Sequence, residues 1–169
     1  ALTASGGEGT ATVTRTDSFA AALAAGATVR VDNVNGDVVA VPGPSFSAVV
    51  TTTATAASPG RAQEALDRVH VTGRTEDGGY RLEVRWPGEG GSRGSSRRHA
   101  EDCRECRIVS RIELSIPTGV HANLQTVNGE VRTRDLDGDL ELHGVNGNLQ
   151  ASGARRSLRA QTVNGRLEV

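Results

Sequence analysis

The chain has 169 residues, with 19 Lys and Arg against 20 Asp and Glu, which gives a formal net charge of −1. This balance excludes the basic footprint of a nucleic-acid-binding protein, and the length predicts one domain or one domain with an insertion. Aromatic residues are scarce, with two Phe, one Tyr and one Trp against 21 Gly, which favours a narrow core of Val, Leu and Ala.

The N-terminus of the sequence is typical of a processed, exported protein. The chain begins at Ala1 with a Gly- and Ser-rich run and contains no Met, so we expect that a signal peptide has been removed. The alanine-rich run 19–27 is too short to cross a membrane, so we expect no direct membrane insertion.

The first third of the chain alternates between strand-like segments and turns. We expect residues 1–9 to form a flexible lead and Thr10–Thr16 to form a strand, because polar and apolar residues alternate there. The segment 29–40 (VRVDNVNGDVVA) has an Asn-Gly corner between valine-rich stretches, and the β-branched run 47–56 predicts another strand.

Residues 57–107 are expected to form an insertion. Ser58 and Pro59 are suited to the N-cap and first position of a helix, with Ala62, Ala65 and Leu66 on its apolar face. Residues 70–73 and 80–85 predict a strand pair around the turn EDGG. A long polar loop follows, and the isoleucines of 108–116 then predict a strand that ends at Pro117.

A nine-residue repeat fills the segment from Thr126 to Val169. Its glycines stand nine or eighteen positions apart, at Gly129, Gly138, Gly147 and Gly165, and Arg156 occupies the remaining slot. Around each glycine, polar and apolar residues alternate as in a strand with one buried face. We expect the following apolar residues to be buried: Val127, Val131, Leu136, Leu140, Leu142, Val145, Leu149, Leu158, Val163 and Leu167.

Two all-β architectures fit this repeat. One is an antiparallel meander, since Asn-Gly is a favoured hairpin turn. The other is a single-stranded parallel β-helix, a two-sided solenoid in which two repeat units make one coil, because Val-Asn-Gly recurs at every second unit. This eighteen-residue recurrence favours the β-helix. We expect its coils to be regular over residues 120–169 and to be interrupted earlier in the chain by the helix and the strand pair. Asn128, Asn146 and Asn164 would then form a corner ladder that stabilises the stack.

The order of these elements, and above all IELSIPTGVHANLQTVNGEV (112–131) followed by the glycine repeats, resembles the putative adhesin family of bacterial β-helix domains. The resemblance covers roughly residues 10–169. It implies a single-stranded parallel β-helix that is exported or associated with the cell envelope. The loop 88–107, with its two cysteines, departs from the family pattern, so the resemblance implies nothing about that loop.

Cys103 and Cys106 form a C-x-x-C, with His99 four residues upstream of the first cysteine. An intrachain disulfide is the usual state of such cysteines in an exported protein. A metal site of His99 and both thiolates is a second interpretation, although no fourth ligand is evident, and interchain disulfides are a third. Arg107 occupies the position where a haem-attachment motif needs His, so no cofactor is expected.

The remaining polar clusters do not form a recognisable catalytic pattern. Asp135, Asp137 and Asp139 are the densest carboxylate run, but a calcium β-roll needs several glycines per repeat, so we expect a solvated corner there. The histidines His121 and His143 fall at outward positions without a Ser/His/Asp or paired-carboxylate pattern. We therefore expect that the protein is not an enzyme.

The sequence favours a secreted or cell-envelope structural or adhesion module. An open sheet edge invites strand addition, so we expect self-association around Val163, Leu167 and Val169 with the N-terminal part of a second copy. The result would be a homo-oligomer or a head-to-tail filament, and a cell-surface glycan or protein is a further candidate partner. Two alternatives stay open: a polysaccharide-binding or polysaccharide-cleaving β-helix protein, and an envelope-stress sensor domain.

Overall fold

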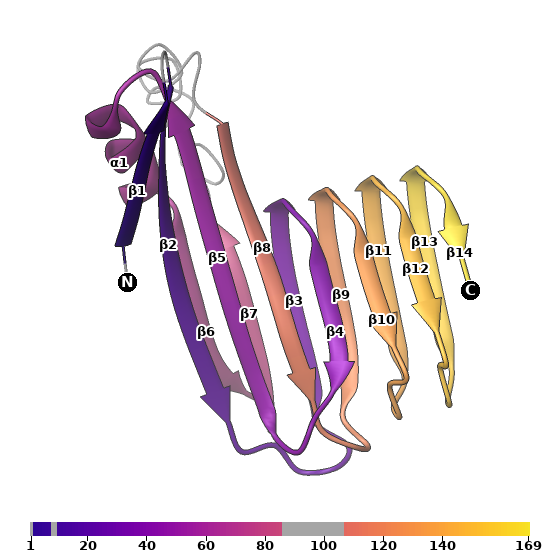
Figure 1. Ribbon diagram of the computed structural model, residues 1–169. Coiled ribbons are helices and arrows are strands. Elements are labelled where there is room, and N and C mark those ends of the chain that lie inside the picture. Colours follow the sequence, from indigo (N-terminus) through magenta and orange to yellow (C-terminus); the bar gives the residue numbers. More distant parts are fainter. Residues whose placement is uncertain (1, 8–9, 86–106) are drawn as a thin grey trace, which may run out of the picture.

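A computed structural model describes residues 2–7, 10–85 and 107–169, which are mostly β (Figure 1). Eight strands form one sheet in the order β1-β2-β5-β8-β4-β10-β12-β14. Their bounds are β1 (Leu2–Gly7), β2 (Thr10–Ala21), β5 (Phe46–Ala56), β8 (Arg107–Ile116), β4 (Val38–Pro42), β10 (Val131–Arg134), β12 (Leu149–Ser152) and β14 (Leu167–Glu168).

Six strands form the second sheet in the order β13-β11-β9-β3-β7-β6. Their bounds are β13 (Leu158–Asn164), β11 (Leu140–Asn146), β9 (His121–Asn128), β3 (Thr28–Asn35), β7 (Gly79–Arg85) and β6 (His70–Glu76), and the single helix of the described residues is α1 (Pro59–Asp67). Residues 2–7, which we expected to be part of a flexible lead, instead pair with β2 as an antiparallel edge strand.

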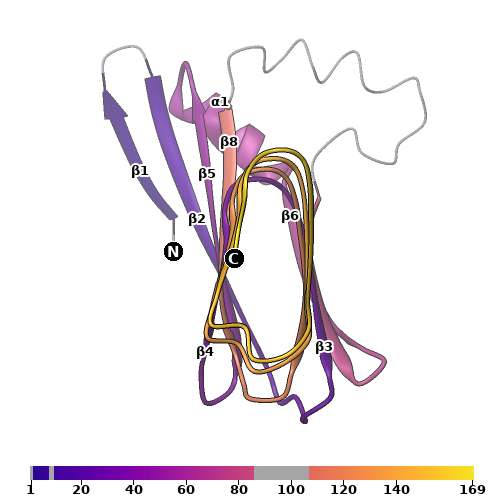
Figure 2. The same cartoon turned by 90° about the vertical axis from the view of Figure 1, so that its right-hand side faces the viewer.

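Both sheets are mixed. The strands β1, β2, β5 and β8 pair antiparallel, whereas β8, β4, β10, β12 and β14 pair parallel, and in the second sheet only β6 is antiparallel to its neighbour. From β9 to β14 successive strands alternate between the sheets. Seen along the stack, these turns of the chain superpose as one elongated loop with two long sides (Figure 2).

Each repeat unit pairs with the next unit but one, as the β-helix interpretation requires. Val131 lies beside Leu149, and Leu149 lies beside Leu167, in parallel register. This pairing excludes the antiparallel meander for the strands from β9 to β14. Among the residues predicted to be buried, Val131, Leu142 and Leu149 have no exposed surface, and Leu136 and Leu140 are buried as well.

One part of the predicted core was wrong, because the valine two residues before each corner glycine does not point inward. Val145 is 38% exposed and Val163 is 70% exposed, and Val127 is half-buried. Strand alternation from the buried Leu124 makes Thr126 the next inward residue, so Val127 must point outward.

At three of the four Asn-Gly corners, the residue three before the glycine is the inward one and is polar, while Gly144 takes that place at the fourth. The hydroxyl of Thr126 donates to the carbonyl oxygen of Gly36 at 3.2 Å, and that of Thr162 donates to Gly147 at 3.1 Å. Asn33, at the same position of its own corner, also donates to Gly36. These bonds satisfy corner carbonyls that the neighbouring strands do not reach.

Leu158 and Leu167 were also predicted to be buried. Leu158 is partly exposed, and Leu167 is 46% exposed. They continue the inward columns of Leu140 and Leu149. Their exposure arises because β13 and β14 each have a hydrogen-bonded neighbour on one side only within the described part of the chain.

The corner glycines stack directly on one another. A Cβ on Gly129 would overlap the carbonyl oxygen of Gly36, and a Cβ on Gly147 would overlap that of Gly129. The repeated glycine is therefore required by close backbone approach between coils, in addition to any turn preference.

The inserted helix forms where the sequence predicted it. The hydroxyl of Ser58 accepts the backbone N–H of Arg61 as an N-cap, and the buried face of α1 packs on the inward face of β2 and β5 through Ala62, Ala65 and Leu66. The predicted strand pair is also present, as β6 and β7.

Candidate functional site

An asparagine column runs along the corner that joins the two sheets. Asn128 donates through its amide to the side-chain oxygen of Asn35 at 2.7 Å, Asn146 to Asn128 at 3.0 Å, and Asn164 to Asn146 at 2.9 Å. The column thus contains the three predicted residues and adds Asn35, from a corner that lies far earlier in the chain. The amides of Asn128 and Asn146 each donate once and accept once within the column, whereas Asn35 only accepts and Asn164 only donates, so every amide keeps further hydrogen-bonding capacity.

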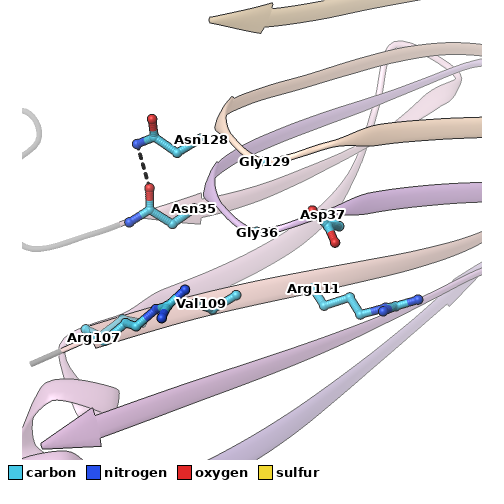
Figure 3. A pocket seen from close by; sticks show the side chains of 9 residues that line it. Asn35, Gly36, Asp37, Arg107, Val109, Arg111, Asn128 and Gly129 are labelled. Carbon is cyan, nitrogen blue, oxygen red and sulfur yellow. Dashed lines mark hydrogen bonds between the residues drawn. The ribbon is translucent and has the colours of Figure 1, made fainter. Parts of the chain in front are cut away.

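A notch opens where this column meets the longer strand β8 (Figure 3). It encloses about 720 Å³, and its polar lining comes from Asn35, Asp37 and Asn128 on the corners and Arg107 and Arg111 on β8. The notch exists because β4 begins beside Ile112, so the first residues of β8 extend past the corners.

Some of the polar groups that line the notch already make hydrogen bonds or ion pairs within the protein. The carboxylate of Asp37 accepts the backbone N–H of Glu130 at 3.0 Å, and Arg111 pairs with Glu113 at 3.2 Å. Near the notch, Asn33 ties the corner to β8 by donating to the carbonyl oxygen of Ser110 at 2.8 Å. The arrangement offers hydrogen bonds to a polar ligand, and its described lining residues include no nucleophile paired with a base.

A second polar cluster lies on the outer face of the other sheet. The backbone N–H of Asp139 donates to Nδ1 of His121 at 2.8 Å, which places the imidazole proton on Nε2. The hydroxyl of Ser157 donates to the carboxylate of Asp139 at 2.8 Å. These three residues occupy equivalent positions of successive coils and therefore lie side by side.

The chemistry of this cluster differs from that of a catalytic triad. The Ser157 hydroxyl donates to Asp139 and not to His121, and this hydrogen bond lowers the pKa of Asp139 below its ordinary value. A carboxylate with a lowered pKa is a weak base at neutral pH, so it does not activate the serine.

The other two aspartates of the predicted carboxylate run, Asp135 and Asp137, each lie near a different arginine. Asp135 lies near Arg134 at 3.7 Å, and Asp137 lies near Arg156 at 3.5 Å. Within residues 2–7, 10–85 and 107–169, no three His, Cys, Asp or Glu side chains are grouped as metal ligands. His99, Cys103 and Cys106, with the predicted disulfide or metal site, lie outside the described residues.

The three residues predicted to mediate self-association lie on or beside the β13–β14 edge. Val163 is 70%, Leu167 46% and Val169 82% exposed. They are among the most exposed large apolar side chains of the described chain, together with Val41 and Val145.

The sequence matches no protein-family model and no curated protein. Among solved structures, the chain is similar to a putative cell adhesion protein from Clostridium sporogenes, with 9% identity, a TM-score of 0.44, and coverage of 92% of this chain and 98% of that one. A putative adhesin from Bacteroides fragilis shares 7% identity at a TM-score of 0.30, covering 92% and 97% of the two chains. A putative lipid binding protein from Parabacteroides distasonis shares 9% identity at 0.32, covering 91% and 62%. These similarities are too low to assign a family.

The described residues include no helix that is long and apolar enough to cross a membrane.

Proposed function

We propose that this chain is a structural or adhesion module of the cell envelope or exterior that associates with further copies through the β13–β14 edge. The observation that carries the proposal is the contrast between Leu149, which is fully buried, and Leu167, its neighbour in the same inward column, which is 46% exposed. One more strand on each sheet would bury Leu167 and Val169 and pair the open backbone groups.

The architecture in this proposal is a single-stranded parallel β-helix. Two features support it: the strict alternation of strands between the sheets from β9 onward, and the parallel pairing of each repeat unit with the next unit but one. Such stacks grow by adding coils, because each coil contacts only its neighbours.

A head-to-tail contact fits the positions of the sheet edges. Within residues 2–7, 10–85 and 107–169, the edge strands are β14 and β1 in the first sheet and β13 and β6 in the second. The next copy therefore presents an edge strand to each open strand. A head-to-tail contact of this kind gives a filament when the rotation between copies does not close a ring.

The cellular location in this proposal rests on the motif resemblance of residues 112–131 to an envelope-associated family. The non-enzymatic role is supported by the Ser157–Asp139 contact, which leaves the serine without an activating base.

Sedimentation velocity over a range of concentrations tests this proposal on the chain of residues 1–169. We expect concentration-dependent association that Leu167→Lys abolishes, because a charge in the apolar edge cannot be buried without a partner. Val145→Lys is the matched control, since Val145 is similarly exposed at 38% but lies on β11, inside the stack. A wild-type chain that stays monomeric at high concentration, with no change in Leu167→Lys, would contradict the proposal.

A further inference from the structure

The corners of the asparagine column share the dipeptide Asn-Gly, at Asn35, Asn128, Asn146 and Asn164. Asparagine deamidates most readily without an enzyme when glycine follows it, because glycine has no Cβ to hinder the approach of its backbone nitrogen to the asparagine side chain. By sequence alone the four sites are equally reactive. The hydrogen bonds that the four corners make in the fold are not equal.

The reaction has two steps. The backbone nitrogen of the glycine loses its proton to hydroxide and attacks Cγ of the asparagine, so that a C–N bond forms, and the side-chain nitrogen takes a proton from water and leaves as ammonia. Water then opens the succinimide ring at one of its two carbonyl carbons and gives aspartate or isoaspartate. A glycine N–H held by a backbone acceptor reacts slowly, because it must first leave that acceptor to turn toward Cγ and lose its proton.

Three of the four corner glycines are held in this way. Each donates its backbone N–H to the carbonyl oxygen of the asparagine in the next coil: Gly36 to Asn128 at 2.8 Å, Gly129 to Asn146 at 3.1 Å and Gly147 to Asn164 at 3.0 Å. These bonds run along the stack, so each coil holds the corner of the coil before it.

Gly165 differs because it lies in the last coil of the stack, between β13 and β14 (Figure 1). Within the described part of the chain, its N–H makes no hydrogen bond to a backbone carbonyl oxygen. Gly165 is also exposed, whereas Gly36 is buried and Gly129 and Gly147 are half-buried. The attacking nitrogen of this one corner is therefore accessible and free to turn.

The side chain of Asn164 is also held less firmly than those of Asn128 and Asn146. Each of these two makes two hydrogen bonds within the column, whereas Asn164 makes one, from its amide to Oδ1 of Asn146 at 2.9 Å. Asn35 also makes only one, but the glycine that follows it is buried and held. Asn164 thus combines a weakly held side chain with an accessible backbone nitrogen.

We propose that Asn164 is a site of spontaneous deamidation in the folded protein, and that the following coil protects Asn35, Asn128 and Asn146 from the same reaction. The product alters the end of the stack in two ways. A carboxylate at position 164 has no N–H to donate to Oδ1 of Asn146, so the column loses its last hydrogen bond. In isoaspartate the backbone is also one atom longer, which shifts Leu167 out of its parallel register with Leu149.

A consequence for assembly rests on the proposed association through the β13–β14 edge. A strand added beside β13 places backbone carbonyl oxygens where the next coil lies at the other three corners, so it protects Asn164. Loss of ammonia is not reversed by water, so the change proceeds in one direction. Chains that stay unassociated lose the associating edge with time, and associated chains keep it.

The test follows deamidation at each corner by peptide mass spectrometry, in the chain of residues 1–169 at mildly alkaline pH and at a dilution where sedimentation shows monomers. We expect Asn164 to react at least about tenfold faster than the other three sites, since each increment of about 1.4 kcal/mol needed to open a protected corner slows its reaction tenfold. The same chain in strong denaturant is the control, and there all four sites should react at similar rates. Asn164→Gln should abolish the early loss of ammonia, because the longer side chain closes its ring far more slowly.

The proposal is overturned if Asn164 reacts no faster than the other three sites in the folded chain, or if it reacts in denaturant but not in the folded chain. The consequence for assembly has its own measurement. Deamidated chains separated by ion exchange should no longer associate, and associated samples should deamidate more slowly at Asn164. A chain that is monomeric at every concentration contradicts the proposed association, whereas the comparison of the four corners still decides the site of deamidation.

Discussion

The hydroxyl of Thr126 donates a hydrogen bond of 3.2 Å to the carbonyl oxygen of Gly36, although the two residues are 90 positions apart in the chain. This bond joins the corner before the insertion to the first corner after it. It also explains why a polar residue occupies a fully buried position at each of these corners, as Asn33 and Thr126 do.

Replacement of Thr126 by Val is expected to lower the free energy of unfolding by about 1 kcal/mol, because the shape is kept and one buried hydrogen bond is lost. Thr51→Val, on the outer face of β5, is the control and should change stability by less than about 0.5 kcal/mol. Urea unfolding of both variants measures the difference. Equal effects would show that the Gly36 contact does not contribute to stability.

The corner glycines give a second stability test. Gly147→Ala should destabilise by about 1–3 kcal/mol or more, because its Cβ would overlap the carbonyl oxygen of Gly129 and the coils would have to separate. Gly60→Ala, in α1, places its Cβ in open space and should stabilise by up to about 1 kcal/mol through helix propensity. Thermal melts that show the same sign for both variants would contradict this account.

The repeat in the sequence was sufficient to predict the parallel pairing of alternate units and the asparagine column. Both follow because identical residues recur every eighteen positions and lie beside one another in adjacent coils. The sequence did not correctly predict which residues of the strand before each corner point inward. Val127 and Thr126 are both β-branched, and hydrophobicity alone favours burying the valine. The sequence shows no sign that the Thr126 hydroxyl has a carbonyl to bind, since Gly36 lies on another coil.

The notch was beyond sequence reasoning for a related reason. The placement of Arg107 and Arg111 beside the asparagine column depends on where β8 starts to pair with β4, at Ile112, and no short-range pattern encodes that register.

The observed inward and outward positions of the repeat predict different losses of unfolding free energy for truncations at Leu149 and Val145. Leu149→Ala should destabilise by about 2–5 kcal/mol, since it removes a fully buried side chain and leaves a cavity. Val145→Ala should cost less than about 1 kcal/mol, because Val145 points outward and is 38% exposed. Denaturant titration separates these values. A large loss of stability in Val145→Ala would show that Val145 points inward, as the sequence first predicted.

Arg15 is expected to hold α1 against β2. Its guanidinium donates to the carbonyl oxygens of Leu66 at 3.2 Å and Val69 at 2.9 Å, at the C-terminal end of the helix, and it pairs with Asp17 at 3.1 Å. Arg15→Met should lower stability by about 1.5–3 kcal/mol, since these bonds are charge-assisted. Arg85→Met, whose side chain is 68% exposed, is the control and should have little effect.

Hydrogen exchange gives a second measurement of this contact. In Arg15→Met the amides of α1 should exchange faster while those of β11 and β12 remain protected, because the contact lies at the far end of the molecule from the repeat. Uniform loss of protection across the chain would show that Arg15 acts on global stability and not on the docking of the helix.

The ionisation of Asp139 depends on the polar row that it forms with His121 and Ser157. The hydrogen bond from the Ser157 hydroxyl is the main cause that lowers the pKa of Asp139 below its ordinary 3.8, with smaller contributions from the backbone N–H of Ser157 and the charge of Arg156. A group whose pKa is lower in the folded protein stabilises the fold above its ordinary pKa, and this contribution is lost as the pH falls through the lower value.

Replacement of Ser157 by Ala should therefore raise the pKa of Asp139 toward 3.8. The variant should differ from the wild type in stability at neutral pH but converge with it well below about pH 4. A carbon-detected NMR titration of the Asp139 carboxyl group measures the shift directly, with Ser152→Ala, an exposed serine on β12, as the control. If the pKa of Asp139 is the same in Ser157→Ala as in the wild type, the Ser157 hydroxyl does not hold the Asp139 carboxylate in place.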